Sequence, residues 1–592
     1  MKNYIISIIA LQIISVFSLY AYENDAGDST EITIVKAMRD ELQRNMLNLE
    51  YQDYKQPFFI SYSIADTRSL FINATLGAIT TSNLTHNRGW IIRVMIGDYQ
   101  LTDENFQDVG DGGSNYNQYL DLPIDNDYYG IRRFLWESTD RVYKSAAQTY
   151  KNKITTLREK NITPEDLPFA DFSRAPKIKK YITGPEFNFN KTKYENIARE
   201  LSSLFKSYPE IIYSDVSIIL LHSDAYFINS EGTEIKLPLT SSTIAVSAQT
   251  MGDDSETLAD QVLYYYRNPA DFPDLDSMKE DVENMLNNLS VLRHAKVFDD
   301  TYSGPVLITD QAVAQLLAGS LFTGAGSLIA HREPLYSNPQ MAMYYGQQSF
   351  SNESKIGKKI LSKYISVKSL PKLNNFNGID LTGSFEIDAE GVVPPEELVL
   401  VENGILKTLL NGRTPTKNIK KSNGHNRYAI IGNIITKQIG PGVIRISSTD
   451  VKSKDELKIE LINKAREEGL DYAIIIRPIS RGINYRPVNI YKVSVDDGSE
   501  ELLRSVNLKS ITTNSLKRIL GLSNNTIVYN TIIPEDVGSG LFNSLKSGSG
   551  IANGLPVSLI VPDAILLEEI EMEGISKPLS NNLPIVDNPV GK

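Results

Sequence analysis

Few side chains of this protein can bind a metal, and their spacing does not favour a metal site. The 592 residues include five histidines and no cysteine. The histidines are His86, His222, His294, His331 and His425. Zinc takes imidazole, thiolate or carboxylate ligands, and two histidines share a helix face only when they stand three or four residues apart. No two histidines here meet that spacing, so we interpret them as isolated surface or core residues, although the fold could still bring distant ones together.

The clearest pattern lies in the second half of the sequence. Residues 304–326 read GPVLITDQAVAQLLAGSLFTGAG, and residues 383–413 read GSFEIDAEGVVPPEELVLVENGILKTLLNGR. These stretches, together with 485–570, resemble the TldD/PmbA family of metallopeptidase-like proteins, long labelled modulators of DNA gyrase. In the catalytic members of that family a Leu-Leu step leads into His-Glu-x-x-x-His on a helix. Here Ala318, Gly319 and Thr323 stand in the three chemical positions after Leu316-Leu317.

The residues at these positions lack the chemistry that the resemblance implies. A zinc peptidase needs about three protein ligands and an open position for water, and a carboxylate that takes a proton from that water. Ala318 and Gly319 offer no donor, and a threonine hydroxyl is a poor zinc ligand. A second placement on His331 also fails, because Arg332 would replace the glutamate and Tyr336 the second histidine. The absence of cysteine removes a further metal ligand of catalytic relatives, so we expect no catalytic residue, metal or cofactor here.

The N-terminus is typical of a secretory signal peptide over residues 1–21. Lys2 supplies a positive charge, residues 5–19 form an apolar stretch, and Ala21 offers a small residue for cleavage. The apolar stretch is shorter than the roughly 20 residues of a membrane span, and no cysteine follows it to carry a lipid. We expect export to a periplasm or beyond with no stable membrane span, and an uncleaved anchor is the alternative.

Composition indicates a globular protein of more than one domain. The chain is 41% hydrophobic and 22% charged, and its length exceeds that of one ordinary core. Its net charge of −12 argues against a nucleic-acid-binding surface, because affinity for phosphate depends on clustered lysine and arginine. The label of gyrase modulator therefore gains no support from the charge.

We predict an α+β fold with two domains. Residues 22–298 form an N-terminal α/β domain with a mixed sheet and long helices, and residues 302–592 a mainly antiparallel β domain. Apolar residues at helical spacing predict helices over 33–49, 131–158, 193–205, 277–296, 311–322 and 454–467. Ser453 and Glu456 form a capping box before the last of these. Segments rich in glycine and small polar residues predict long loops at 103–128 and 534–554.

Shorter apolar runs predict the strands. They cover 58–64, 70–80, 90–101, 216–221, 225–229, 243–248, 397–401, 405–410, 472–477 and 488–495. Asn403-Gly404 predicts a type I′ turn, since both residues accept positive φ values. The segment Asn229-Ser230-Glu231-Gly232 resembles a hairpin turn of the family, and we interpret it as turn chemistry rather than as a substrate site.

The best remaining candidate site is the loop that contains Asn423, Gly424, His425 and Arg427. It resembles a loop that lies near the active cleft in relatives. Arg427 could hold a peptide carboxylate, Gly424 permits close backbone approach, and His425 could act as a general base at neutral pH. We favour the alternative of a polar surface loop.

A cluster of carboxylates is a second candidate. Glu386, Asp388 and Glu390 alternate along a predicted strand and would share one face. Three like charges suit either a cation site or plain solvation, and we favour solvation.

Two functions fit these observations. The favoured one is a TldD/PmbA-like homologue that has lost its His-Glu-x-x-x-His site and is a non-catalytic peptide-binding or partner subunit of an exported peptidase complex. Such a chain would form a homodimer or a heterodimer with a TldD-type catalytic subunit, since PmbA-type members also lack the motif and pair in that way. The alternative is an active metallopeptidase that cleaves small or unfolded peptides through an unrecognised metal site.

Overall fold

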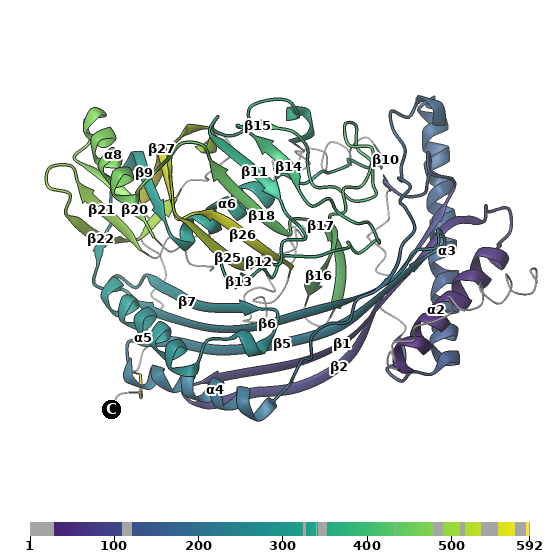
Figure 1. The fold of residues 1–592 in the computed structure, drawn as a ribbon, viewed down its shortest axis with the longest axis horizontal. Helices are drawn as coiled ribbons and strands as arrows, with labels where there is room; N and C mark the ends of the chain where they lie inside the picture. The colour runs from purple at the N-terminus through teal and green to yellow at the C-terminus, as the bar shows by residue number, and fades with distance from the viewer. Residues whose placement is uncertain are drawn as a thin grey trace, which may run out of the picture.

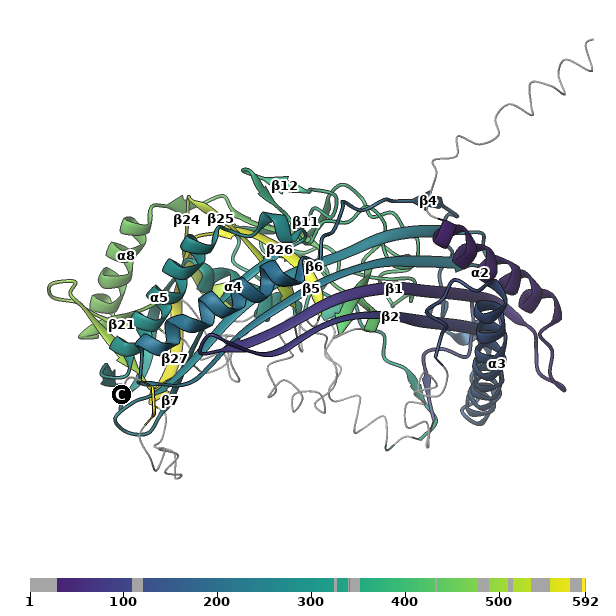
Figure 2. The ribbon, with the colours of Figure 1, turned by 90° about the horizontal axis from the view of Figure 1, so that it is seen from below.

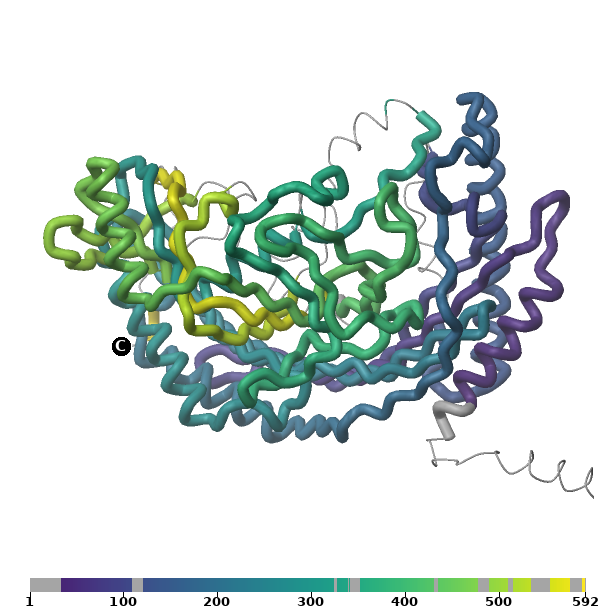
Figure 3. Tube along the Cα trace, turned by 45° about the horizontal axis from the view of Figure 1, so that its top comes forward, coloured from purple at the N-terminus to yellow at the C-terminus, as the bar shows by residue number. Residues whose placement is uncertain are grey.

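The computed structural model describes residues 29–108, 121–323, 327–338, 340, 352–431, 434–477, 489–508, 515–533, 554–574 and 588–590. The predicted signal peptide, the middle of the 103–128 loop and nearly all of the 534–554 loop lie outside these residues. The fold is α+β, as predicted. The first half forms one long curved sheet with helices, and the second half lies over the concave side of that sheet (Figures 1 and 3).

The first sheet is mixed, as predicted. Its strand order is β2-β1-β5-β6-β4, and β7 also pairs with β6. The strands are β1 (Pro57–Thr75), β2 (Ala78–Ile96), β4 (Lys179–Tyr181), β5 (Ile211–Asn229), β6 (Glu234–Met251) and β7 (Thr257–Tyr266). All neighbours are antiparallel except β4, which runs parallel to β6. A strand of 19 residues extends about 60 Å, so β1, β2 and β5 span the molecule (Figure 2).

Alternation along β1 separates the two faces of the sheet. One face buries Ile60, Tyr62, Ile64, Leu70, Ile72 and Ala74. Helices α2 (Ser29–Asn48) and α3 (Tyr128–Glu159) pack on one end of this face, and α4 (Lys191–Ser203) and α5 (Leu275–Leu292) pack on the other (Figure 2). Ala65 of β1 and Phe227 of β5 point to the opposite face, where they form a core cluster with Ile387 and Tyr428 of the second half.

Four of the predicted strands are parts of two continuous ones. The run at 58–64 and residues 70–75 of the next run belong to β1, and those at 216–221 and 225–229 belong to β5. The predicted strand 70–80 is wrong at its end, because a turn at Leu76-Gly77 separates β1 from β2. Polar residues break the apolar pattern between the two helix pairs, but they bind one another across the strands. Arg88 Nε donates to Asp66 at 2.9 Å, and Thr67 Oγ1 donates to Ser223 at 2.8 Å. The ladder therefore continues where the sequence pattern stops.

The described residues of the second half form two larger sheets and two small strand pairs, and a third small pair joins this half to the first. The six-stranded sheet has the order β15-β14-β11-β18-β26-β25, and the nine-stranded sheet has the order β19-β24-β27-β9-β20-β21-β22-β8, with β23 on β27. Their strands are β8 (Lys296–Val297), β9 (Thr301–Thr309), β11 (Ile365–Ser369), β14 (Leu398–Glu402), β15 (Ile405–Leu406), β18 (Val443–Ser448), β19 (Val451–Lys452), β20 (Tyr472–Ile476), β21 (Ile490–Ser494), β22 (Glu500–Arg504), β23 (Val506–Leu508), β24 (Ile519–Ser523), β25 (Thr526–Ile533), β26 (Leu555–Pro562) and β27 (Ala564–Gly574). The small pairs are β3 (Phe106–Gln107) with β10 (Leu335–Tyr336), β12 (Asn375–Phe376) with β13 (Ile379–Asp380), and β16 (Asn426–Ile431) with β17 (Ile434–Ile439).

Most strand pairs of the second half are antiparallel, as predicted. The exceptions are β9 with β20, β18 with β26, β19 with β24, β22 with β8, and β3 with β10. The boundary between residues 298 and 302 stays a prediction, and β8, just before it, already pairs with β22 of the second half.

Local signals in the second half are confirmed residue by residue. Helix α6 spans Gln311–Phe322 and α8 spans Lys454–Glu467, as predicted. The Ser453 side chain accepts from the backbone of Glu456, whose side chain accepts from the backbone of Ser453. Asn403 and Gly404 have φ values of 49° and 78°, which fit the predicted turn. The predicted strand 405–410 is shorter than expected and ends with β15 at Leu406.

Candidate functional site

Helix α6 carries the positions where catalytic relatives would hold a metal. It follows β9 and packs against β9, β25 and β26. Its apolar face buries Ala312, Val313, Ala314, Leu316, Leu317, Ala318, Leu321 and Phe322. These side chains belong to the largest apolar core of the protein, which fixes the helix in place.

The three motif positions lie at the C-terminal end of α6. Ala318 is 8% exposed and belongs to the core. Gly319 is partly exposed, and apart from its chain neighbours and the backbone of α6 no described atom lies within 4 Å of the point where its Cβ would stand. Thr323 follows the helix, and its Oγ1 donates to the carbonyl of Gly319 at 2.6 Å. The small side chains therefore leave room beside Gly319, since neither Phe322 nor Tyr336 fills that space. They leave no such room at Ala318, which lies in the core.

These residues do not fit a zinc ion. None of the three side chains offers an imidazole, thiolate or carboxylate, and the hydroxyl of Thr323 is already bonded to the helix. Over the described part of the chain, no group of three histidine, aspartate or glutamate side chains is arranged to hold a metal. The second placement also lacks a helix, because His331 lies in an extended segment and the guanidinium of Arg332 pairs with Asp171.

The histidines lie apart in the fold. His86 and His222 stand beside Arg68 on opposite sides of β1, so a strand separates them. His86 Nε2 lies 2.7 Å from the carboxylate of Asp66. His294 is exposed, with its Nδ1 3.4 Å from a carboxylate oxygen of Asp253. Each of these rings has its own carboxylate neighbour and no second histidine.

The candidate loop at 423–428 is buried rather than on the surface, so the favoured interpretation of a polar surface loop is wrong. His425 is fully buried, with Nδ1 donating to the carbonyl of Asn423 at 2.9 Å and Nε2 accepting from the hydroxyl of Ser369 at 2.9 Å. Burial lowers the pKa of His425 to about 4, so the ring is neutral at pH 7. Gly424 has a φ of 75°, and a Cβ there would stand 2.9 Å from the backbone of Pro394.

The other two side chains of this loop are also bonded within the protein. The amide of Asn423 donates to the carbonyl of Leu409 at 2.8 Å. Arg427 Nη1 donates to the carbonyls of Pro556, at 2.7 Å, and Pro441. The loop is therefore preorganised by these bonds, and a role in substrate binding stays a prediction.

The carboxylate cluster is split between surface and interior, so the predicted solvation holds for one residue only. Glu386 is exposed and pairs with Lys180. Asp388 is 1% exposed and Glu390 6% exposed, and they lie in a turn rather than on a strand. Burial and the charge of Glu390 raise the pKa of Asp388 to about 7. Burial opposes ionisation of Glu390 as well, but the charges of Arg93, Lys437 and Arg413 hold its pKa below the usual range.

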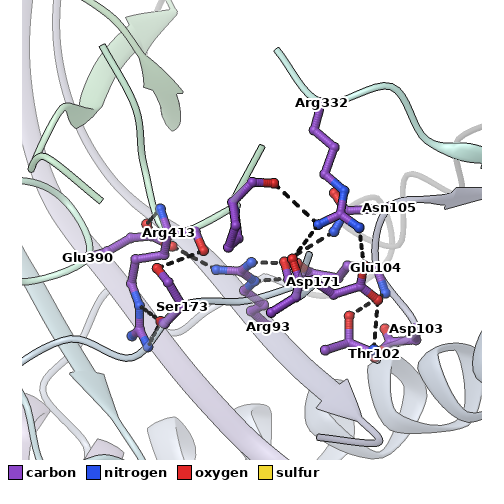
Figure 4. A network of polar contacts seen from close by, with 12 residues as sticks. Arg93, Thr102, Asp103, Glu104, Asn105, Asp171, Ser173, Arg332, Glu390 and Arg413 are labelled. Atoms are coloured by element: carbon purple, nitrogen blue, oxygen red, sulfur yellow. Dashed lines mark hydrogen bonds and ion pairs between the residues drawn. The ribbon is translucent and has the colours of Figure 1, made fainter. Parts of the chain in front are cut away.

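A buried ionic network surrounds Glu390 and joins the two halves of the chain (Figure 4). Arg93 of β2 bridges Glu104 and Glu390, with Nη1 2.7 Å from the carboxylate of Glu390. Arg413 donates twice to Glu231, at 2.6 and 2.8 Å, and both its Nε and Nη2 donate to the carbonyl of Ser173. Each charge in this chain of contacts meets an opposite charge, which is the arrangement of a structural junction.

A second pair of contacts continues the network towards α3. Asp171 is shared by Arg332 and by Lys153 of α3, whose Nζ lies 2.6 Å from the carboxylate. These pairings were not predicted, because Arg332 lies 161 residues from Asp171 in the chain and nothing near either residue indicates the other. The turn Asn229 to Gly232 and the Asn-Gly-Arg that ends the 383–413 stretch were visible signals, and their charged residues, Glu231 and Arg413, bind each other.

Comparison with known proteins agrees with this architecture. Residues 301–573 match the family model described as PmbA/TldA metallopeptidase C-terminal domain. A protein named metalloprotease from Methanothermobacter thermautotrophicus is 34% identical over 114 residues, which span 19% of this chain and 22% of that protein. The shared stretch thus covers about a fifth of the relative.

Solved structures share the fold over most of the chain. TldE from Thermococcus kodakarensis has a TM-score of 0.53 at 14% identity and covers 91% of this chain and all of its own. A candidate DNA gyrase modulator from Thermotoga maritima has a TM-score of 0.52 at 14% identity, covering 87% and 96%. Another from Bacteroides thetaiotaomicron has a TM-score of 0.53 at 10% identity, covering 93% and 99%. The family match places residues 301–573 in the TldD/PmbA family, and the solved structures share the fold of most of the chain.

Proposed function

We propose that this protein is a non-catalytic peptide-binding or partner subunit of an exported peptidase complex. The end of α6 carries the proposal. Ala318 and Gly319 have no ligand atom, and the hydroxyl of Thr323 is bonded to the helix backbone. Peptidase chemistry of the zinc type needs ligands and a carboxylate base at these positions, and this chain has none there.

The partner role and the export are supported by separate observations. The resemblance of the sequence implies a PmbA-type chain, and such chains pair with a catalytic TldD-type subunit. Export is supported by the charge and the apolar stretch of residues 1–21, which precede the described residues. Among the described residues, no helix is long and apolar enough to cross a membrane.

Metal analysis of the purified chain tests the loss of catalysis. We expect well below one zinc per chain. We also expect no chelator-sensitive cleavage of unstructured peptides. One tightly held zinc per chain, lost together with peptidase activity on chelation, would instead support the alternative of an active metallopeptidase.

Restoring the motif asks whether only the ligands were lost. The triple variant Ala318→His, Gly319→Glu and Thr323→His places the family residues on α6. The glutamate has room, since nothing described lies within 4 Å of the Gly319 Cβ position, whereas a histidine at Ala318 must enter the core. We expect a folded variant with weak zinc binding and no cleavage, because a further ligand is missing. Gain of peptidase activity would show that the rest of the catalytic machinery is intact, and Gly319→Glu alone is the matched control.

Co-expression tests the partner role. The chain would be purified beside a relative from the same cell that carries an intact His-Glu-x-x-x-His, after separating periplasm from cytoplasm. We expect both in the exported fraction and in one complex of defined stoichiometry. Recovery of this chain only from the cytoplasm, or of two separate proteins, would contradict export or pairing respectively.

A further inference from the structure

Four arginines are buried among the described residues. Three of them have a carboxylate partner within ion-pair distance. These are Arg88 with Asp66, Arg413 with Glu231, and Arg504 with Asp254 and Glu256. Arg267 and Arg427 form no ion pair with any residue that the structure describes, although Arg427 is only 7% exposed.

These two guanidinium groups lie against the same short segment, residues 382–385. Arg267, just after β7, donates from Nη2 to the carbonyl of Thr382 at 3.2 Å and to the hydroxyl of Ser384 at 2.8 Å. Arg427, on β16, lies over the ring of Phe385 with its Cζ 4.6 Å from the ring centroid. The first half and the second half of the chain thus each bring one cation to this place.

Neutral oxygens accept all the hydrogen bonds that this pair makes. Besides Thr382 and Ser384, the acceptors are the carbonyls of Pro441 and Pro556, which Arg427 Nη1 contacts. Burial and, to a smaller extent, the charge of Arg267 lower the pKa of Arg427 to about 9. Burying a charge without a counter-charge is costly, and two neighbouring cations add repulsion. An anion between them would remove both costs.

Several N–H groups of the pair are available to such an anion. Nε and Nη1 of Arg267, and Nε and Nη2 of Arg427, have no hydrogen-bond partner among the described residues. None of the four is among the fully buried polar atoms that lack a partner, so solvent reaches them. Arg267 is partly exposed, so its free N–H groups lie near the surface. A guanidinium matches the two oxygens of a carboxylate with parallel donors.

We propose that Arg267 and Arg427 bind a carboxylate between them. The source that fits the proposed peptide-binding function is the C-terminal carboxylate of a peptide, and this part of the inference rests on that function. A small free carboxylate would meet the same two guanidinium groups, so the site itself does not depend on the peptide.

Calorimetric titration of the full chain separates the two sources. The probes are N-acetyl-trialanine with a free carboxylate, the same peptide with a C-terminal amide, and acetate. We expect the free-acid peptide to bind and the amide to bind at least about tenfold more weakly. We expect Arg267→Gln to weaken binding of the free acid about 10- to 100-fold, the loss of one charge-assisted contact.

Control variants keep the inference falsifiable. Arg445→Gln removes an exposed arginine of β18, in the same half as Arg427, and should bind as the natural protein does. If Arg267→Gln fails to fold, Arg267→Lys keeps the charge without the fork and should bind more weakly than the natural protein. Acetate binding as tight as that of the peptide supports the carboxylate site and overturns the peptide source. Absence of binding for all three probes, or binding unchanged in the Arg267 variants, overturns the site whatever zinc analysis shows.

Discussion

Helix α6 and the junction around Arg413 differ in the number of charged side chains and in how those side chains are paired. At the end of α6 the side chains are small or bonded to the helix, and open space remains beside Gly319. At the junction the charges are many, and they are matched both within the first half and across the two halves of the chain. The family resemblance points to the first place for catalysis, but the concentration of ionisable groups is at the second.

The contrast shows that a buried charge can have a structural role or a functional one. A group with a perturbed pKa in a buried cluster is a candidate for function, but paired structural charges give the same signature. Partners within the protein bind the charged groups of Glu390, Arg93 and Arg413. These groups are therefore occupied and not available to a substrate. The Arg267 and Arg427 pair is the exception, because neither guanidinium forms an ion pair with a described residue and both donate to neutral oxygens.

Removing Arg413 should break the junction and cause the largest loss of stability. Arg413→Ala removes the cation and two donors from the carboxylate of Glu231, which keeps only neutral donors such as the hydroxyl of Tyr99. It also removes both side-chain donors from the carbonyl of Ser173. Loss of one partner of a buried ion pair costs about 3–5 kcal/mol. Chemical denaturation should show this drop in unfolding free energy.

The matched control is an exposed ion pair of the same type. Arg518 pairs with Glu569 at the surface, and Arg518→Ala should change the unfolding free energy by less than about 1 kcal/mol. An equally small effect for Arg413→Ala would mean that the junction does not hold the halves together.

Asp388 should make the unfolding free energy of the protein depend on pH, an effect that the residues of α6 should not produce. Its folded pKa of about 7 lies above the roughly 3.9 of an unfolded aspartate. The folded chain therefore holds a proton that the unfolded chain has lost, and this contribution to stability disappears as the pH rises from about 4 to about 7. Asp388→Asn removes this titration. The unfolding free energy of the variant minus that of the natural protein should therefore rise by about 2–4 kcal/mol as the pH goes from 4 to 8.

Unfolding free energies at both pH values check this, with Glu386→Gln as control. Glu386 is the exposed carboxylate two residues away, paired with Lys180. Its variant should track the natural protein at both pH values. A parallel offset for Asp388→Asn at pH 4 and pH 8 would show that Asp388 is ionised throughout.

Local signals of the sequence predicted α6 and the cap of α8, because the information lies within one or two helical turns. The length of β1 was missed, since the polar residues that interrupt its pattern are satisfied by neighbouring strands, as in Asp66 with Arg88. The burial of Glu390 was missed for the same reason on a larger scale. Its partner Arg93 is 297 residues away in the chain, so nothing near Glu390 indicates that its charge is compensated.

The smallest expected effect tests the open space on α6. Gly319 has a helical conformation, and a methyl group there meets no described atom within 4 Å. Gly319→Ala should therefore raise the unfolding free energy by about 0.5–1 kcal/mol, the difference in helix propensity between the two residues. Gly424→Ala is the contrasting variant, because it puts a side chain at a φ of 75° and 2.9 Å from the backbone of Pro394. It should lower the unfolding free energy by more than about 1 kcal/mol. Thermal and denaturant unfolding measure both, and a destabilised Gly319→Ala would mean that the space beside α6 is filled and closed to any ligand.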